Sequence, residues 1–296
     1  MNKPYVAQVE LTRGCNMSCT FCAIDSVPKE RKYMNTMIAT KTAYELSVFD
    51  PIRIEFSLRG EPTLNPNWLQ IVEIFRQYNP KSQITLATNG TKITPKEASI
   101  FYGIGGNILI LDAYGKSKMK LTSRFKKFHP IDYYSGLFNP YHKHPASTKK
   151  LIIIDDLKRR DNEKQTRKIL NQAGNVNYAK CGLEPLSEPL QKRCVHPFRE
   201  INIFWNGDIP ICCRDWKEET ILWNVKKGHL KEYWEKNNVL NAYRYLLFHR
   251  NREYGICQRC DYNGGMRVGL IEQMAPFSEG KAEQAMKLIE VSINGN

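Results

Sequence analysis

The sequence lacks the apolar segments that secreted and membrane proteins carry. Residues 1–5 begin no signal-peptide-like apolar run, and no stretch approaches the roughly 18 consecutive apolar residues of a membrane-spanning helix. We therefore expect a cytoplasmic protein with no membrane partner. In a reducing compartment the nine cysteines are not expected to form disulfides, and their clustering favours metal binding.

Acidic residues are few compared with basic ones, at 30 Asp and Glu against 44 Lys and Arg, which gives a formal net charge of +14. This excess permits an anionic partner, such as a nucleic acid, an acidic peptide or a phosphorylated small molecule. The alternative is a solvated basic face without a partner. Because the motifs of common nucleic-acid-binding domains are also absent, the charge alone does not identify a partner.

Three cysteines lie close together near the start of the chain, in the pattern Cys15-x3-Cys19-x2-Cys22. Cysteine thiolates are the usual protein ligands of iron–sulfur clusters, and three ligands leave one iron of a four-iron cluster open for chemistry. The alternatives are a zinc site, which prefers four ligands, and a disulfide knot, which requires an oxidising compartment. The spacing favours the cluster.

Short apolar runs alternate with amphipathic segments along the first 180 residues. We predict strands at 5–11, 52–58, 83–88, 107–112, 151–154 and 176–180, and helices at 36–49, 67–78, from residue 95 onwards, at 117–128 and at 159–172. This alternation predicts an α/β fold, a partial (β/α)6 barrel with parallel strands, in which ligands bind at the carboxyl ends of the strands. The segment 129–148 is long for a loop, which makes it a candidate lid.

Three motifs at predicted strand ends resemble the radical SAM superfamily. They are the three-cysteine pattern with Phe21 before its last cysteine, the segment Arg59-Gly60-Glu61-Pro62, and the turn Thr88-Asn89-Gly90. The resemblance implies that Cys15, Cys19 and Cys22 hold a [4Fe-4S] cluster whose open iron binds S-adenosylmethionine (SAM). It further implies reductive cleavage of SAM to a 5′-deoxyadenosyl radical, and a reductant of the flavodoxin or ferredoxin type.

The same resemblance suggests which residues contact SAM. Phe21 is expected to pack on the adenine, and Asn89 to hydrogen-bond the ribose. The backbone around Gly60 and Glu61 is expected to meet the ammonium group, because glycine permits close approach. The motif departs from the family pattern at Arg59, which stands where the family has its first glycine.

Two further polar side chains are candidates for the cofactor site. Asp112 ends a buried apolar strand and is expected to face the cavity. Arg124 is a candidate partner for the SAM carboxylate, and the alternative is a surface arginine.

A second cysteine set follows in the C-terminal third, with Cys194, Gly207 and Cys212 in the pattern C-x12-G-x4-C and then Cys257-x2-Cys260. It resembles the twitch domain, the one-cluster relative of the SPASM extension of radical SAM enzymes. The resemblance implies that these four cysteines bind a second, auxiliary [4Fe-4S] cluster, next to a β-hairpin with an Asn-Gly turn and a helix at 230–248. The alternative is a structural zinc site.

Two cysteines are left over, Cys181 and Cys213. Cys213 adjoins Cys212 and is a possible substitute for it, although the spacing from Gly207 favours Cys212. Cys181 is either a hydrogen-atom donor, as an epimerase requires, or a small buried apolar residue.

We predict three regions and one class of reaction. Residues 1–185 form the barrel, 186–265 the auxiliary cluster domain and 266–296 a C-terminal helical tail. The favoured function is oxidation of a small polar substrate, as in one-cluster relatives that oxidise an aminocyclitol alcohol. The alternatives are peptide maturation or epimerisation, modification of a nucleotide or nucleic acid, and a metal-binding protein without catalysis.

Overall fold

The central element of the computed structural model is a seven-stranded sheet in which all neighbouring strands are parallel. The structure describes residues 3–113, 117–126, 131–134, 149–155, 170–264 and 282–294. The strand order is β7-β8-β6-β5-β4-β1-β9. The strands are β1 (Val6–Val9), β4 (Arg53–Phe56), β5 (Gln83–Thr88), β6 (Ile108–Ala113), β7 (Ile131–Tyr134), β8 (Lys150–Asp155) and β9 (Glu200–Ile203).

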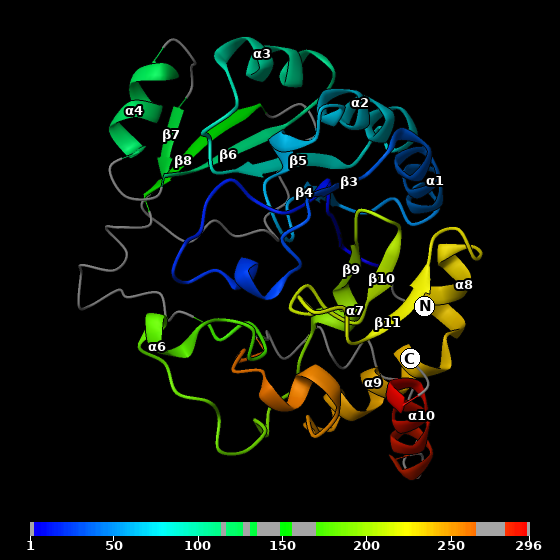
Figure 1. Ribbon diagram of the computed structural model, residues 1–296. Helices are drawn as coiled ribbons and strands as arrows, with labels where there is room; N and C mark the ends of the chain where they lie inside the picture. Colours follow the sequence, from blue (N-terminus) through cyan, green and yellow to red (C-terminus); the bar gives the residue numbers. More distant parts are fainter. Residues whose placement is uncertain are drawn as a thin grey trace.

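Four helices connect the strands and cover one side of the sheet (Figure 1). They are α1 (Thr36–Ser47), α2 (Trp68–Tyr78), α3 (Pro95–Gly103) and α4 (Ser117–Arg124). Local signals begin them: the Asn35 side chain accepts from the N–H of Ile38, and Thr94 and Glu97 form a capping box. Helix α2 buries an apolar stripe on the sheet. There the Phe56 and Phe75 rings pack edge to face, with their centroids 5.1 Å apart.

The strands themselves are apolar and buried, as parallel strands covered on both faces must be. Ile54, Phe56, Ile84, Leu86 and Leu109 are fully inaccessible to solvent. The predicted α/β class and the first five predicted strands are therefore confirmed, and their carboxyl ends share one edge of the sheet.

The sixth predicted strand is wrong. Residues 176–180 instead lead into helix α6 (Tyr178–Cys181), because the Asn177 side chain caps its N-terminus and Gly182 ends it with a φ of +61°. Two other strands extend the sheet: β7, within the segment predicted as a loop, and β9, which pairs with β1. Most of the predicted helix at 159–172 lies outside the described residues.

The C-terminal third adds a small antiparallel hairpin and helices. These are α7 (His196–Arg199), β10 (Asp208–Pro210), β11 (Ile221–Asn224), α8 (Leu230–Lys236), α9 (Asn238–Phe248), the 3-10 helix η3 (Gly255–Arg259) and α10 (Ala282–Asn294). The single predicted helix at 230–248 is two helices, because Asn237 interrupts the first and caps the second. The predicted Asn-Gly turn lies between β9 and β10, while the hairpin partner of β10 is β11. Helix α10 lies beside α9 (Figure 1).

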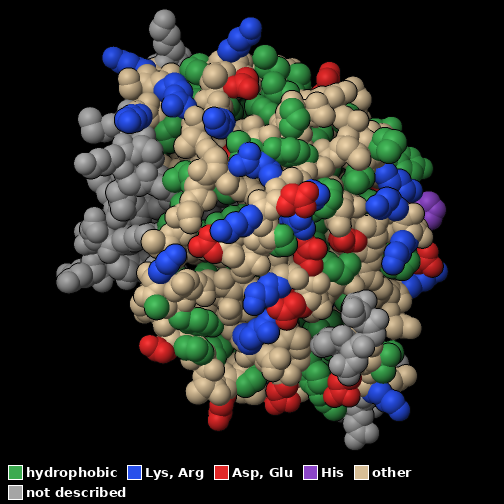
Figure 2. Space-filling model, in the orientation of Figure 1, with side chains coloured by type: hydrophobic (Ala, Val, Ile, Leu, Met, Phe, Trp, Pro, Cys, Tyr) green, Lys and Arg blue, Asp and Glu red, His purple; other side chains and the backbone are tan. Residues whose placement is uncertain are grey.

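The surface charge is mixed on the face drawn in Figure 2. Lys and Arg side chains are interspersed there with Asp and Glu side chains over much of that face. Within the described ranges, no helix is both long and apolar enough to span a membrane.

Candidate active site and auxiliary cysteine pocket

The first three cysteines lie on one loop at the carboxyl end of β1. We call residues 14–22 the core cysteine loop. It lies between β2 (Thr12–Arg13) and the 3-10 helix η1 (Ala23–Ser26). Strand β2 pairs antiparallel with β3 (Lys32–Tyr33), which joins the two ends of the segment that contains the loop. Cys15, Cys19 and Cys22 are all half-buried. The loop turns tightly, with the N–H of Cys22 donating to the carbonyl of Cys19 at 3.0 Å.

The core cysteines form a donor set that favours a bound cation. Burial, together with the neighbouring Cys19 and Cys15, raises the pKa of Cys22 to about 11. Burial also raises the pKa of Cys15. Three crowded thiolates repel each other, and a metal that binds them as thiolates removes this penalty. The three side chains therefore fit the cluster that their spacing predicts.

Gly60 lies directly against the core cysteine loop. Its φ is +84°, and a Cβ there would lie 2.3 Å from the carbonyl oxygen of Thr12 and 2.4 Å from that of Gly14. The next N–H, that of Glu61, donates to the Gly14 carbonyl at 3.0 Å. Only glycine fits this position, so the end of β4 supports the start of the loop.

The carboxylate of Glu61 connects two strand ends. It accepts hydrogen bonds from the Thr63 N–H at 3.0 Å, the Thr63 hydroxyl at 2.6 Å, the Thr88 hydroxyl at 2.5 Å and the Asn89 N–H at 2.8 Å. With only 2% of Glu61 exposed, this carboxylate is a structural link between β4 and β5. Sequence reasoning missed this role, although Thr63 and Thr88 are donors inside the two motifs.

Asn89 faces the core cysteine loop. Its Nδ2 donates to Asn16 Oδ1 at 2.9 Å and lies 3.7 Å from the sulfur of Cys15, and its Oδ1 accepts from the N–H and hydroxyl of Thr91. The predicted ribose contact stays a prediction, because it requires the amide to exchange one of these partners.

The remaining predicted SAM contacts lie around the same edge. Arg124 donates from Nη1 to the carbonyls of Gly90 at 2.7 Å and Ile93 at 3.3 Å, so it braces the turn after β5. Asp112 is half-buried near the end of β6, and Phe21 is half-buried beside Cys22. Their contacts with SAM stay predictions.

Arg59, the departure from the family motif, is fully buried and joins the barrel to the C-terminal third. Its Nε and Nη2 donate to the two carboxylate oxygens of Glu10, each at 2.9 Å. Its Nη1 donates to the Trp216 carbonyl at 3.0 Å and to Glu218 at 2.9 Å, and its guanidinium lies 3.5 Å from the centroid of the Phe204 ring. This side chain therefore ties the core motif to the segment 204–218.

The second cysteine set converges on one pocket. Cys194, Cys212, Cys257 and Cys260 all line it. We call it the auxiliary pocket. Its cysteines come from before α7, after β10 and around η3. Burial raises the pKa of Cys194 to about 11 and also raises that of Cys257 and Cys260. This donor set, too, fits an iron–sulfur core that binds the cysteines as thiolates.

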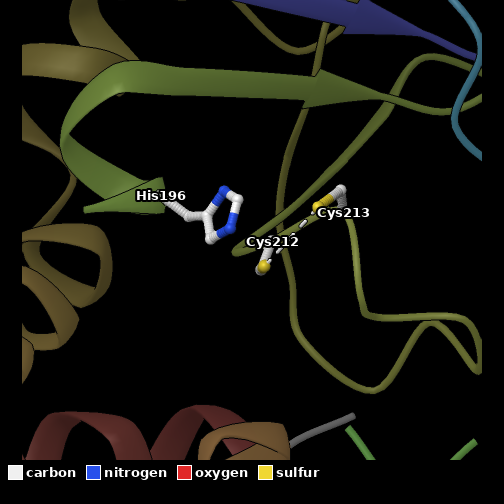
Figure 3. A group of neighbouring side chains, drawn as sticks. All are labelled: His196, Cys212 and Cys213. Atoms are coloured by element: carbon white, nitrogen blue, oxygen red, sulfur yellow. Dashed lines mark hydrogen bonds between the residues drawn. The ribbon is translucent and has the colours of Figure 1, made fainter. Parts of the chain in front are cut away.

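A histidine that sequence reasoning missed adjoins this pocket. The donor atoms of His196, Cys212 and Cys213 lie within 4.8 Å of one another (Figure 3). The Nδ1 of His196 is 2.8 Å from Glu200 Oε2, whereas its buried Nε2 has no hydrogen-bond partner in the part of the chain that the structure describes. Of the two adjacent cysteines, Cys212 lines the auxiliary pocket and Cys213 does not, so the geometry favours Cys212 as the ligand.

Cys181 lies beside the core cysteine loop. It ends α6, and its thiol donates to the carbonyl of Thr20 at 3.0 Å. It belongs to a small apolar cluster that includes Cys22 and Trp216.

Comparison with known proteins agrees with this geometry. The Radical SAM superfamily model matches residues 9–113, and the model of the SPASM domain, an iron–sulfur cluster-binding domain, matches residues 194–261. A GTP 3′,8-cyclase from Chlorobaculum tepidum is 24% identical over 125 residues, which are 42% of this chain and only 38% of that protein.

Solved structures share the fold. BtrN in complex with AdoMet and 2-DOIA has a TM-score of 0.67 at 20% identity, over 88% of this chain and 95% of BtrN. Streptococcus suis SuiB bound to its precursor peptide SuiA has a TM-score of 0.55 at 14% identity, over 93% of this chain and 74% of the SuiB chain. The two domains imply a SAM-binding [4Fe-4S] cluster and an auxiliary iron–sulfur cluster. The chain is therefore a member of the radical SAM superfamily with a C-terminal SPASM-type iron–sulfur domain.

Proposed function

We propose that this protein oxidises a small polar substrate by radical SAM chemistry and that the auxiliary cluster accepts one electron. The observation that carries the proposal is the convergence of four cysteines on the auxiliary pocket. Four protein ligands leave no open iron on a four-iron cluster, so a cluster held there suits electron transfer better than substrate binding.

We propose Cys15, Cys19 and Cys22 as the ligands of the SAM-binding cluster, and Cys194, Cys212, Cys257 and Cys260 as those of the auxiliary cluster. When both are bound, SAM supplies a 5′-deoxyadenosyl radical and the auxiliary cluster an electron acceptor, so that the substrate loses a hydrogen atom, an electron and a proton. The first electron comes from a flavodoxin- or ferredoxin-type reductant.

The surrounding residues position these groups. Gly60 brings backbone against the core cysteine loop, Glu61 fixes the ends of β4 and β5, and Asn89 orients its amide toward Cys15. We assign Phe21 to the adenine, and Asp112 and Arg124 to the rim of the same cavity. The fold of BtrN, solved with AdoMet and 2-DOIA, supports a small polar substrate of the aminocyclitol class.

Epimerisation is the second candidate, and Cys181 supports it. The thiol lies against the core cysteine loop through Thr20, close enough to the loop to suit a hydrogen-atom donor. If epimerisation is the reaction, turnover in deuterated water places deuterium in the product, and Cys181→Ser abolishes that incorporation. Oxidation instead leaves the product at a higher oxidation level and does not require Cys181.

The test is turnover of the anaerobically reconstituted protein with dithionite and SAM. The substrates are aminocyclitols and sugar alcohols that carry deuterium at each carbinol carbon. We expect mass spectrometry to detect 5′-deoxyadenosine that contains deuterium, together with a product two hydrogens lighter. Deuterium-free 5′-deoxyadenosine with every such substrate, or deuterium transfer only from labelled peptides, would overturn the proposal.

A further inference from the structure

Two buried arginines line the auxiliary pocket together with its cysteines. Arg214 is 8% exposed and Arg252 is 2% exposed. Among the described residues, those that line this pocket include no carboxylate. Buried positive charges are costly unless an anion lies close to them, so this composition indicates a negatively charged occupant.

Arg252 is held entirely by neutral acceptors. Its Nε donates to the carbonyl of Lys192 at 2.7 Å, Nη1 to that of Tyr262 at 2.7 Å and Nη2 to that of Arg193 at 2.8 Å. These three bonds fix the guanidinium in place and leave its charge without a counterion. The side chain is thus a rigid positive charge at the wall of the pocket.

Arg214 has fewer partners. Its Nη1 donates to Gln172 Oε1 at 2.9 Å, and its guanidinium lies 4.7 Å from the centroid of the Tyr262 ring. Its buried Nε has no hydrogen-bond partner within the described ranges of the chain. Among the described residues, neither Arg214 nor Arg252 forms an ion pair with a carboxylate.

The nearest sulfurs interact electrostatically with Arg214. Burial by itself lowers its pKa, but Cys213, Cys260 and Cys212 raise the pKa above its ordinary value. The carboxylates close by are already engaged with backbone N–H groups: Asp215 accepts from Thr220 at 2.7 Å and Asp261 from Asn171 at 3.0 Å. The cysteine sulfurs are therefore the main negative charges available to the two guanidinium groups.

We propose that Arg214 and Arg252 raise the reduction potential of the auxiliary cluster, and that the Nε–H of Arg214 donates a hydrogen bond to a sulfur of that cluster or of its cysteine ligands. Four thiolates on an oxidised four-iron core carry a net charge of about −2, and one-electron reduction adds another negative charge. Fixed positive charges at the sulfurs stabilise the reduced form more than the oxidised form. The inference rests on the proposed role of this cluster as electron acceptor, because a raised potential favours uptake of the substrate's electron.

The test is a redox titration of the auxiliary cluster, followed by EPR, in the full chain with Cys15, Cys19 and Cys22 replaced by alanine. We expect Arg214→Gln to lower the equilibrium constant for reduction about tenfold, which is about 59 mV for one electron. Arg214→Lys keeps the charge and is expected to retain most of the potential. The matched control is Arg259→Gln, which removes an arginine beside Cys260 that is half-exposed and already paired with Glu219 at 2.8 Å.

Gln172→Glu tests the same charge without removing Arg214. The isosteric carboxylate would form an ion pair with Nη1, so the equilibrium constant is expected to fall about threefold or more, with the cluster fully assembled. Unchanged potentials in Arg214→Gln and Gln172→Glu would overturn the proposal. An equal fall of the reduction potential in Arg214→Lys and Arg214→Gln would also overturn it, since the effect would then come from lost packing and not from lost charge. The titration uses neither SAM nor substrate, so its outcome is independent of the oxidation test.

Discussion

The core cysteine loop and the auxiliary pocket both gather cysteines, but they do so in opposite ways. The core cysteines lie half-buried on one short loop, where Cys15 accepts from the Met17 N–H of that loop and contacts the Asn89 amide at the end of β5. The auxiliary cysteines come from three segments and line a pocket with two buried guanidinium groups. Three cysteines leave one iron of a four-iron cluster open for a cofactor, whereas four cysteines leave none open, which favours electron transfer at the second site.

The two sites are also mechanically linked. Arg59 leaves the core motif and reaches Glu10, Glu218 and the Trp216 carbonyl, so the loop and the auxiliary domain share one buried side chain. The comparison therefore predicts that some changes affect one site alone, while a change at Arg59 affects the packing between them.

Removal of a ligand of the SAM-binding cluster is expected to have the largest effect, and to affect the core site without affecting the auxiliary cluster. Cys19→Ala is expected to abolish 5′-deoxyadenosine formation and to lower the iron content from about eight to about four per chain, because only the auxiliary cluster remains. Cys181→Ala is the control, since this thiol contacts the same loop through Thr20 without being a proposed ligand. Loss of all iron from Cys19→Ala would contradict the independence of the two sites.

Arg59→Met breaks the link between the sites. The carboxylate of Glu10 would be left buried without its cation, at a cost of roughly 3–5 kcal/mol. We expect the Tm of the anaerobic holoprotein to fall by at least about 6 °C.

The control for Arg59 is Lys180→Met, which removes an exposed ion pair with Asp25 and should change stability by at most about 0.5 kcal/mol. The double variant Glu10→Gln/Arg59→Met should recover part of the loss. Equal stabilities of Arg59→Met and Lys180→Met would show that the buried pair does not join the two regions.

Gly60→Ala should damage the core site alone. The new Cβ would overlap the carbonyls of Thr12 and Gly14, so the loop must shift. We expect SAM cleavage to fall at least about tenfold, from about 1–3 kcal/mol of strain, while the auxiliary EPR signal is retained. Gly103→Ala, where a Cβ meets nothing within 4 Å, should be neutral, and wild-type cleavage in Gly60→Ala would refute the packing argument.

Glu61→Gln is the mildest of these changes. The amide places N–H donors where Thr88 and Asn89 already donate, at a cost of about 1–3 kcal/mol. We expect weaker SAM binding by calorimetry and an unchanged auxiliary spectrum. Glu73→Gln, on the exposed side of α2, is the control, and equal SAM affinities in the two variants would contradict the structural role of Glu61.

Local patterns in the sequence predicted β1, β4, β5, β6 and β8, the helices between them and the two cysteine sets. Apolar runs, proline and asparagine caps and cysteine spacings act within a few residues, so they can be read directly. The break at Asn237 was also a local signal, since asparagine is a good cap, but the apolar stripe on both sides of it favoured one long helix.

Most of what the sequence did not predict depends on residues far apart along the chain. The pairing of β9 with β1, the partners of Arg59 and the guanidinium groups in the auxiliary pocket join residues far apart along the chain. At 176–180, a short segment with apolar residues resembled a strand, but it leads into helix α6, which Asn177 caps at its N-terminus and Gly182 ends. The ion-pair partners of a charged residue in a motif, such as Arg59, cannot be predicted from the sequence because they lie far away along the chain.

One measurement tests the central claim most directly: metal analysis and EPR of the full chain in which Cys15, Cys19 and Cys22 are alanine. The account predicts about four irons per chain and a reducible signal that SAM does not change, because Cys194, Cys212, Cys257 and Cys260 would occupy every iron. Zinc in place of iron, or a signal that shifts on addition of SAM, would contradict a closed electron-accepting cluster in the auxiliary pocket.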